Sequence, residues 1–417
     1  MRKKFLFIIC IFLGVVIQFI PISIGDEIDN EIIDINSEIL ESSTIPQHEI
    51  KVPKTNSQAC IVLNRKTNTV LYGKNENSKR KMASTTKIMT ATIILEYCNL
   101  NDIVEISKKA AGTGGSRLGL KSGDKITIKD LLYGLMMRSG NDAAVALAEY
   151  AGGNIENFAT LMNQKALTLG LSNTHFETPH GLDSDEHYTT AYELAILSNY
   201  ALNNKTFAQI VGTKEYTITI NGFSKKLSNT NELLGNLNGV YGIKTGFTNG
   251  ANRCLVTSCK RDDIDIICVV LGADTKKFRT TDSIKLINYI FDNFEIINVQ
   301  NLINKEFENW KKENLDTFII NKGISNNINL KLENLEQTCI PIRKDFITNL
   351  KISINCTTNF EAPIYKNKEI GNITLTSEDQ IISNCKIYSD INILKKSPLY
   401  YMNYFFKSFS SIIQINF

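Results

Sequence analysis

The sequence lacks the features that mark nucleic-acid-binding and zinc-dependent proteins. Its 46 lysines and arginines nearly balance 43 aspartates and glutamates over 417 residues, and it contains no long basic run. Because a basic stretch is the electrostatic footprint of nucleic-acid binding, its absence argues against such a partner. The four histidines form no HExxH motif, and the nine cysteines form no CxxC pair. The sequence therefore offers no recognisable metal site.

The cysteines and histidines also show no other functional arrangement. The eight cysteines beyond the N-terminal leader are scattered, several of them in apolar, strand-like runs such as "IDIICVVLGA". Since small disulfide-dependent secreted proteins carry a regular cysteine framework, we expect buried free thiols here. His175, His180 and His187 lie close together in the sequence, and we expect them to shape a loop rather than bind a metal.

The N-terminus is typical of an exported protein. "MRKK" precedes the apolar run "FLFIICIFLGVVIQFIPISIG", and Ser23 and Gly25 are the small residues expected before a signal-peptidase cut. The alternative is an uncleaved membrane anchor, because the apolar run is nearly long enough to span a membrane. We therefore predict a signal peptide over residues 1–25, followed by an acidic spacer over 26–50.

The C-terminal segment, residues 395–417, predicts an amphipathic helix. Its polar residues Asn403, Lys407, Ser410 and Gln414 follow one another at spacings that form one stripe of a helix, and aromatic and aliphatic residues cover most of the rest. A membrane-spanning helix should not carry such a stripe, so we expect a helix that lies in a membrane interface. The alternative is a helix docked on the protein's own core.

Between these ends the sequence predicts two domains. In residues 51–293, "ACIVLNRKTNTVLYGKN" indicates a hairpin, "TIKDLLYGLMMRSGNDAAVALAEYAGG" indicates two helices split at "RSGN", and strands follow over about 206–272. Strands at both ends of a helical block indicate an α+β fold with one shared antiparallel sheet. Residues 294–394 contain short strand-like runs, which predict a smaller all-β domain.

A serine and a lysine stand three residues apart in "MASTTKIMTA", at the start of an apolar helix-like segment. Ser84 resembles a helix N-cap, but Lys87 then lies in the first turn, where the helix dipole disfavours a cation. Positions i and i+3 share a helix face, so Lys87 Nζ can reach Ser84 Oγ and remove its proton. A lysine can act as a base when desolvation or nearby positive charge lowers its pKa.

Two further motifs strengthen this interpretation. Ser139-Gly140-Asn141 falls at the break between the two predicted helices, where a hydroxyl can relay a proton and an amide can hold a substrate carbonyl or position Lys87. Lys244-Thr245-Gly246 lies on a predicted edge strand. A lysine and a threonine there can bind a terminal carboxylate, and a glycine lets a substrate backbone approach closely. Each motif alone has a purely structural explanation, but the three together in this order point to catalysis.

SxxK, SxN and KTG in this order are the signature of penicillin-binding proteins and serine β-lactamases. The sequence most resembles the low-molecular-weight penicillin-binding proteins, which are serine-type D-alanyl-D-alanine carboxypeptidases of the peptidase S11 kind. Supporting stretches are "FETPHGLDSDEHYTTAYELAILS", "GVYGIKTGFTNGANRCLV" and, in the second domain, "FEAPIYKNKEIGNITL". The resemblance spans about residues 51–394, and the amphipathic tail is similar to the family's membrane anchor.

The resemblance implies a role for each catalytic residue. Ser84 would attack the carbonyl between two terminal D-Ala residues of a peptidoglycan stem peptide, and β-lactams such as penicillin would acylate it. Lys87 would act as general base, Ser139 would relay the proton, and Asn141 would orient the substrate. The backbone N–H groups of Ser84 and Phe247 would form the oxyanion hole.

The resemblance also implies a substrate-binding set and a location. Lys244 and Thr245 would bind the terminal carboxylate beside Gly246. Arg279 stands where the family often has an assisting arginine, although a surface helix charge explains it equally well. No metal or organic cofactor is implied, because serine–lysine chemistry needs none. The enzyme would work outside the cytoplasm, held on the outer face of the cytoplasmic membrane by its C-terminal helix.

Three alternatives remain open at this point. A serine β-lactamase would share the acylation step, and Glu177 lies roughly where class A enzymes place a deacylating glutamate, although without the usual ExxLN context. A transpeptidase or endopeptidase is poorly separated from a carboxypeptidase by sequence. A catalytically silent wall-binding protein could keep the fold, although the intact motifs argue against that.

Overall fold

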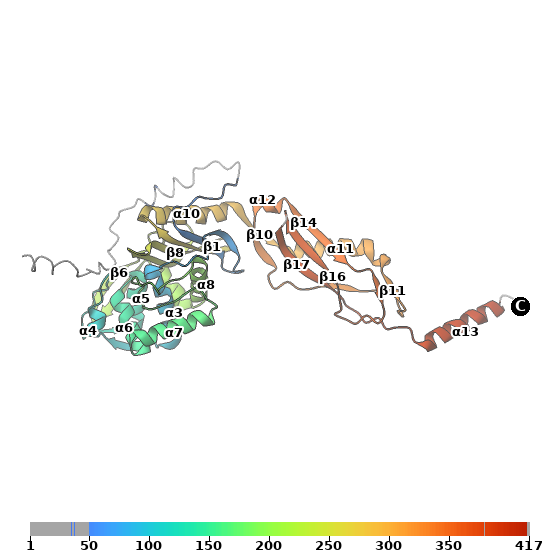
Figure 1. Ribbon diagram of the computed structural model, residues 1–417, viewed down its shortest axis with the longest axis horizontal. Coiled ribbons are helices and arrows are strands. Elements are labelled where there is room, and N and C mark those ends of the chain that lie inside the picture. Colours follow the sequence, from blue (N-terminus) through green and yellow to red (C-terminus); the bar gives the residue numbers. More distant parts are fainter. Residues whose placement is uncertain (1–34, 36, 38–49, 379, 415–417) are drawn as a thin grey trace, which may run out of the picture. The chain divides into compact units, whose positions relative to one another are not determined.

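The computed structural model describes residues 35, 37, 50–378 and 380–414 (Figure 1). Two compact units divide the chain between Ile290 and Phe291, and each is described by itself. The predicted signal peptide lies outside the described residues, and so does the predicted acidic spacer apart from residues 35, 37 and 50.

The first unit is built on a five-stranded antiparallel sheet with the strand order β2-β1-β9-β8-β7. The strands are β1 Ala59–Asn64, β2 Val70–Lys74, β7 Val240–Thr248, β8 Asn252–Arg261 and β9 Ile264–Ala273. Strand β1 is buried along its whole length and β9 along nearly all of it, which explains their continuous apolar sequences. The predicted hairpin, the shared sheet and the edge position of the strand carrying Lys244 are thereby confirmed.

Helices cover both faces of this sheet. Figure 1 shows α10 on one face and the main helical block on the other. The helices are α3 Lys87–Tyr97, α4 Lys108–Ala111, α5 Ile128–Met137, α6 Asn141–Gly152, α7 Ile155–Thr168, α8 Ala191–Leu202, α9 Lys205–Gly212 and α10 Lys276–Asn293. Short two-stranded ribbons join β3 Ile103–Glu105 to β4 Lys125–Thr127, and β5 Glu215–Ile220 to β6 Phe223–Ser228.

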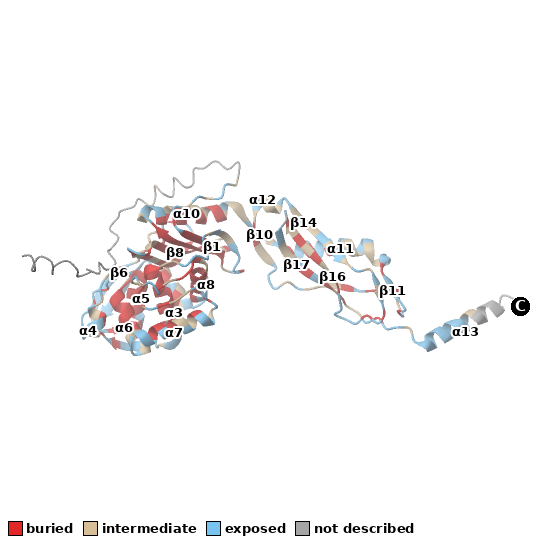
Figure 2. Ribbon diagram, viewed as in Figure 1, coloured by how far each residue is buried: buried red, intermediate tan, exposed pale blue. Residues whose placement is uncertain are grey.

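The central helices form where the sequence predicts them. Thr127 caps α5 by accepting the Asp130 N–H at 3.1 Å, and Gly153 ends α6 at φ +76°. Helix α3 is buried over its first eight residues, so it forms the centre of the helical block (Figure 2). One boundary differs: strands were expected from about residue 206, but that segment begins with α9, whose apolar side packs into the helical core.

The second unit is β-rich, as predicted, but it also contains a helix that the sequence pattern did not reveal. Its sheets have the orders β12-β17-β16-β14, β10-β13 and β11-β15. The strands are β10 Phe294–Asn298, β11 Ile319–Asn321, β12 Leu330–Leu332, β13 Cys339–Arg343, β14 Leu350–Cys356, β15 Asn359–Glu361, β16 Glu369–Ser377 and β17 Gln380–Ser389. Helix α11, Val299–Asn314, packs Val299, Ile303 and Phe307 into the core of this sheet. A short helix, α12, spans Lys344–Ile347.

The chain continues into helix α13, Pro398–Gln414. Its described side chains from Leu399 to Phe406 lie mostly in solvent (Figure 2). Among the residues that the structure describes, no helix is long and apolar enough to cross a membrane.

Candidate active site

Ser84 lies in a strained turn directly before α3. The turn is a 3₁₀ helix, η1 Ala83–Thr86, and α3 begins only at Lys87, so Ser84 is not the helix N-cap that its sequence context suggested. Ala83 has φ +49°, a conformation that costs free energy for any residue with a side chain. Such strain persists only where the surroundings fix it, and it places the Ser84 hydroxyl at the end of a buried helix.

Lys87 is fully buried, and its ammonium group meets three oxygen atoms. Nζ lies 2.7 Å from Ser84 Oγ, 2.7 Å from Asn141 Oδ1 and 2.8 Å from the carbonyl oxygen of His180. A buried cation without acceptors would be prohibitively costly, so these contacts explain why Lys87 is tolerated there. They also hold its nitrogen against the serine hydroxyl, as proton transfer requires.

The second motif forms the turn between α5 and α6. Ser139 has φ +59°, and Asn141 is the first residue of α6. The Asn141 amide donates to the carbonyl of Gly114 at 2.8 Å while its oxygen accepts from Lys87. Next to it, the buried Asp142 carboxylate accepts the N–H groups of residues 118–120 at 2.8–3.0 Å. The start of α6 therefore fixes both the amide beside Lys87 and the backbone of the loop at residues 118–120.

The third motif lies on β7, directly beside the nucleophile turn. A Cβ placed on Gly246 would lie 3.1 Å from the Ser84 backbone nitrogen, a tight contact that the absence of a side chain at Gly246 avoids. Lys244 is buried and its Nζ donates to the carbonyl of Thr245 at 2.8 Å. The Thr245 hydroxyl lies 2.9 Å from that of Thr230. The ring of Phe247, the next residue on β7, stacks under the Arg253 guanidinium.

The loop that contains His180 and His187 packs against the turn that carries Ser84. Gly181 has φ +89°, and a Cβ there would lie 2.0 Å from the carbonyl oxygen of Ala83. The Glu177 N–H donates to His187 Nδ1 at 3.0 Å, so the neutral ring carries its proton on Nε2. Nε2 lies 2.8 Å from the Thr86 hydroxyl, which donates to the Ala83 carbonyl at 2.8 Å.

Both buried histidines are kept neutral. Burial, reinforced by the nearby Lys87 charge and by His187, lowers the pKa of His180 to about 3. Burial, together with His175 and Lys87, lowers the pKa of His187 to about 4. These residues shape a loop, as expected, but the loop is part of the site, because it supplies one of the acceptors that hold Lys87.

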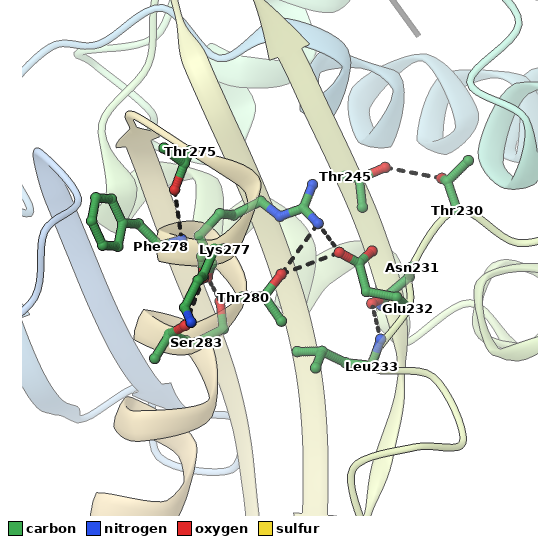
Figure 3. Close-up of polar contacts among 12 residues, drawn as sticks. Thr230, Asn231, Glu232, Leu233, Thr245, Thr275, Lys277, Phe278, Thr280 and Ser283 are labelled. Atoms are coloured by element: carbon green, nitrogen blue, oxygen red, sulfur yellow. Dashed lines mark hydrogen bonds and ion pairs between the residues drawn. The ribbon is translucent and has the colours of Figure 1, made fainter. Parts of the chain in front are cut away.

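Arg279 is buried and is not a surface helix charge. It lies in α10, is 3% exposed, and forms an ion pair through Nη2 with Glu232. The Thr280 hydroxyl donates to the same Glu232 oxygen at 3.1 Å (Figure 3). Figure 3 shows Glu232 between Thr280 and the Thr230–Thr245 pair. The structure therefore places the Arg279 cation near the KTG strand, where the Glu232 carboxylate is already its ion-pair partner.

Comparison with known proteins identifies the family of this chain. Residues 46–275 match the family model described as D-alanyl-D-alanine carboxypeptidase, peptidase S11, and residues 317–402 match that of the penicillin-binding protein 5 C-terminal domain. The chain belongs to the peptidase S11 family of D-alanyl-D-alanine carboxypeptidases. It is thus a serine-type D-alanyl-D-alanine carboxypeptidase with the α+β catalytic fold and the β-rich second domain of the low-molecular-weight penicillin-binding proteins. The family is extracytoplasmic.

Three relatives illustrate the similarity. The D-alanyl-D-alanine carboxypeptidase DacF of Bacillus subtilis is 33% identical over 79% of this chain and 84% of its own. The crystal structure of penicillin-binding protein 5 from Haemophilus influenzae is 27% identical with a TM-score of 0.66, covering 83% of this chain and all of its own. The Streptomyces K15 DD-transpeptidase is 35% identical with a TM-score of 0.56, covering 58% of this chain and 99% of its own.

The structure brings Lys87, Asn141 and Gly246 close to Ser84, whereas Arg279 is paired with Glu232. Sequence reasoning missed three groups that hold these residues. These are the His180 carbonyl, the Thr86–His187 pair and the Glu232 carboxylate. None of these groups belongs to a recognisable sequence motif. The one local signal was Gly181 in "PHGLD", since a glycine in a turn often marks a positive φ or a close approach.

Proposed function

We propose that Ser84 is the nucleophile and Lys87 the general base of this carboxypeptidase. The observation that carries the proposal is the position of Lys87 Nζ, 2.7 Å from Ser84 Oγ inside a buried site. Lys87, once deprotonated, takes the hydroxyl proton as Ser84 Oγ attacks the carbonyl between two terminal D-Ala residues. The C–N bond then breaks, and the departing D-Ala nitrogen receives a proton through Ser139. An acyl-enzyme on Ser84 remains.

The neighbouring motifs bind and polarise the substrate in this proposal. Lys244 and Thr245 hold the terminal carboxylate, and Asn141 orients the peptide beside Lys87. The backbone N–H groups of Ser84 and Phe247 receive the developing oxyanion. The close approach of Gly246 to the Ser84 nitrogen supports this, because it brings β7, which carries the Phe247 N–H, next to the turn that carries the Ser84 N–H. Lys87 then activates the water that hydrolyses the acyl-enzyme.

No observation favours a β-lactamase over this reaction. Glu177 is exposed, and its carboxylate accepts a hydrogen bond from Ser184 in the same loop. Its backbone N–H supports His187 instead. We therefore infer slow hydrolysis of the penicilloyl enzyme and productive hydrolysis of the peptidyl enzyme.

Replacing the nucleophile tests these roles. In Ser84→Ala, release of D-Ala from a peptide ending in D-Ala-D-Ala should fall to background while the circular dichroism spectrum stays unchanged. Ser224→Ala, which removes an exposed hydroxyl from β6 of the same unit, is the matched control and should keep full activity. D-Ala release that persists in Ser84→Ala would contradict the assignment.

We also propose that the chain is divided into a signal peptide (1–25), a spacer (26–50), a catalytic domain (51–293), a β-rich domain (294–394) and an anchor (395–417). Helix α13 supports the last part, because its described aromatic and aliphatic side chains are 41–68% exposed. Docking on the protein's own core would bury them. These side chains are Leu399, Tyr400, Tyr401, Met402, Tyr404, Phe405 and Phe406. Insertion of this surface into the outer face of the cytoplasmic membrane would hold the enzyme near its substrate.

Vesicle flotation tests the anchor. Residues 26–417 should float with vesicles of anionic and neutral phospholipids, whereas residues 26–397 should stay in solution and retain full D-Ala release. Equal flotation of the two proteins, or none for either, would show that α13 is not the anchor.

A further inference from the structure

The contacts of Arg279 leave part of the hydrogen-bonding capacity of its guanidinium group unsatisfied. Nη2 is paired with Glu232 and lies 3.4 Å from the Thr280 hydroxyl. Nε is buried and has no hydrogen-bond partner. A buried donor without an acceptor is costly. The group therefore retains the capacity to bind a second acceptor, while Glu232 holds one edge of its planar fork.

The segment that carries Glu232 also holds the KTG strand. Asn231 donates to the carbonyl of Gly242 on β7 at 2.9 Å, and the Thr230 hydroxyl lies 2.9 Å from that of Thr245. Three consecutive residues thus connect the threonine of the KTG motif, the backbone of its strand and Arg279. The Glu232 carboxylate is thereby fixed beside the proposed binding place of the substrate's terminal carboxylate (Figure 3).

The burial of the Arg279–Glu232 pair strengthens the electrostatic effect of its charges. The Arg279 side chain is 4% exposed and the Glu232 side chain 18%, so solvent screens their interaction weakly. Glu232 cancels the positive charge of Arg279 within the pair. A substrate carboxylate that approaches Arg279 must therefore share the guanidinium with Glu232.

We propose that Glu232 is a specificity-determining residue, which competes with the terminal carboxylate of the substrate for Arg279. The inference rests on the proposed function, in which Lys244 and Thr245 bind that carboxylate. It predicts that Glu232 weakens the enzyme's preference for peptides with a free terminal carboxylate over peptides whose C-terminus carries no charge.

Glu232→Gln tests the proposal because it removes the charge but keeps an amide oxygen for Arg279 and Thr280. The substrates are diacetyl-L-Lys-D-Ala-D-Ala and the same peptide with a C-terminal carboxamide, and mass spectrometry measures the released D-Ala or D-alaninamide. We expect KM for the free acid to fall about three- to tenfold with kcat nearly unchanged, and KM for the amide to stay constant. The acid-to-amide ratio of kcat/KM does not depend on the folded fraction of a preparation.

Two control variants separate competition from other effects. Glu215→Gln breaks an exposed ion pair with Lys226 on the β5–β6 ribbon and should leave the acid-to-amide ratio unchanged. In the background of Arg279→Gln, Glu232→Gln should give no further gain, because the contested cation is gone.

The outcomes distinguish this inference from the function on which it rests. If the wild-type enzyme releases D-Ala but Glu232→Gln leaves the ratio unchanged or lowers it, competition is refuted and the carboxypeptidase roles stand. A gain that persists without Arg279 refutes it as well, since the effect is then one of general charge. If the wild-type enzyme releases no D-Ala, both proposals fail.

Discussion

The stability of the catalytic unit should fall steeply below neutral pH because two buried histidines under the active site are held neutral. His180 and His187 have pKa values of about 3 and about 4 in the folded protein, against the ordinary value of 6.5. Between these values the unfolded chain binds protons that the folded chain excludes. The contribution of the two neutral histidines to the free energy of unfolding is therefore fully present above the unfolded pKa of 6.5. It is lost as the pH falls towards the folded pKa values.

The size of the effect follows from the same values. At about pH 5 each histidine is almost fully protonated in the unfolded chain and almost fully neutral in the folded one, which costs about 2 kcal/mol per residue relative to pH 8. The two together should lower the free energy of unfolding by about 4 kcal/mol. Carboxylates contribute little in this window, because most titrate below it.

Urea unfolding at several pH values measures this, and the chain contains its own control. All four histidines precede residue 188, whereas the single tryptophan, Trp310, packs against Phe307 and Phe318 in the second unit. Far-ultraviolet circular dichroism follows both units, and Trp310 fluorescence follows the second alone. Only the transition of the first unit should move between pH 8 and 5, and His187→Gln should remove about half of its shift. A shift below about 1 kcal/mol would refute the assigned neutral state.

Two further substitutions probe the support of Ser84. Gly181→Ala places a methyl group against the Ala83 carbonyl at a positive φ. The free energy of unfolding, measured in urea, should therefore fall by about 1–3 kcal/mol or more, and the acylation rate of Ser84 should fall as well. An unchanged acylation rate would refute the close contact. Asn141→Ala removes an acceptor from the buried Lys87 ammonium and should lower kcat/KM by about 10²-fold, measured by D-Ala release; a loss below about threefold would contradict its role.

Local patterns were enough to predict the parts of the fold that depend on neighbouring residues. The helix break at Ser139 and the hairpin of β1 and β2 follow from capping residues and apolar periodicity, and the structure confirms both. Helices α9 and α11 were missed because their few apolar positions acquire meaning only from the cores against which they pack. Short amphipathic segments of this kind are ambiguous between helix and strand.

The candidate site divides in the same way. Ser84 and Lys87 are three residues apart, so helical geometry alone brings them together. The acceptors of Lys87 on residues 141 and 180, and the ion pair between Glu232 and Arg279, join segments that are distant in sequence. A backbone carbonyl such as that of His180 leaves no trace in residue identity. The sequence therefore predicts the reacting groups and Asn141, whereas the other groups that hold them become visible only in the folded chain.

The central claim is that Ser84, activated by Lys87, forms a covalent acyl-enzyme. An intact-mass time course of residues 26–394 with benzylpenicillin tests it most directly, with peptide mapping of the adduct. We predict the mass gain of one penicilloyl group on Ser84 that persists after free drug is removed, and no gain in Ser84→Ala. An adduct that disappears as drug is consumed would point to a β-lactamase. A folded protein with no adduct, or with an adduct on another residue, would contradict the claim.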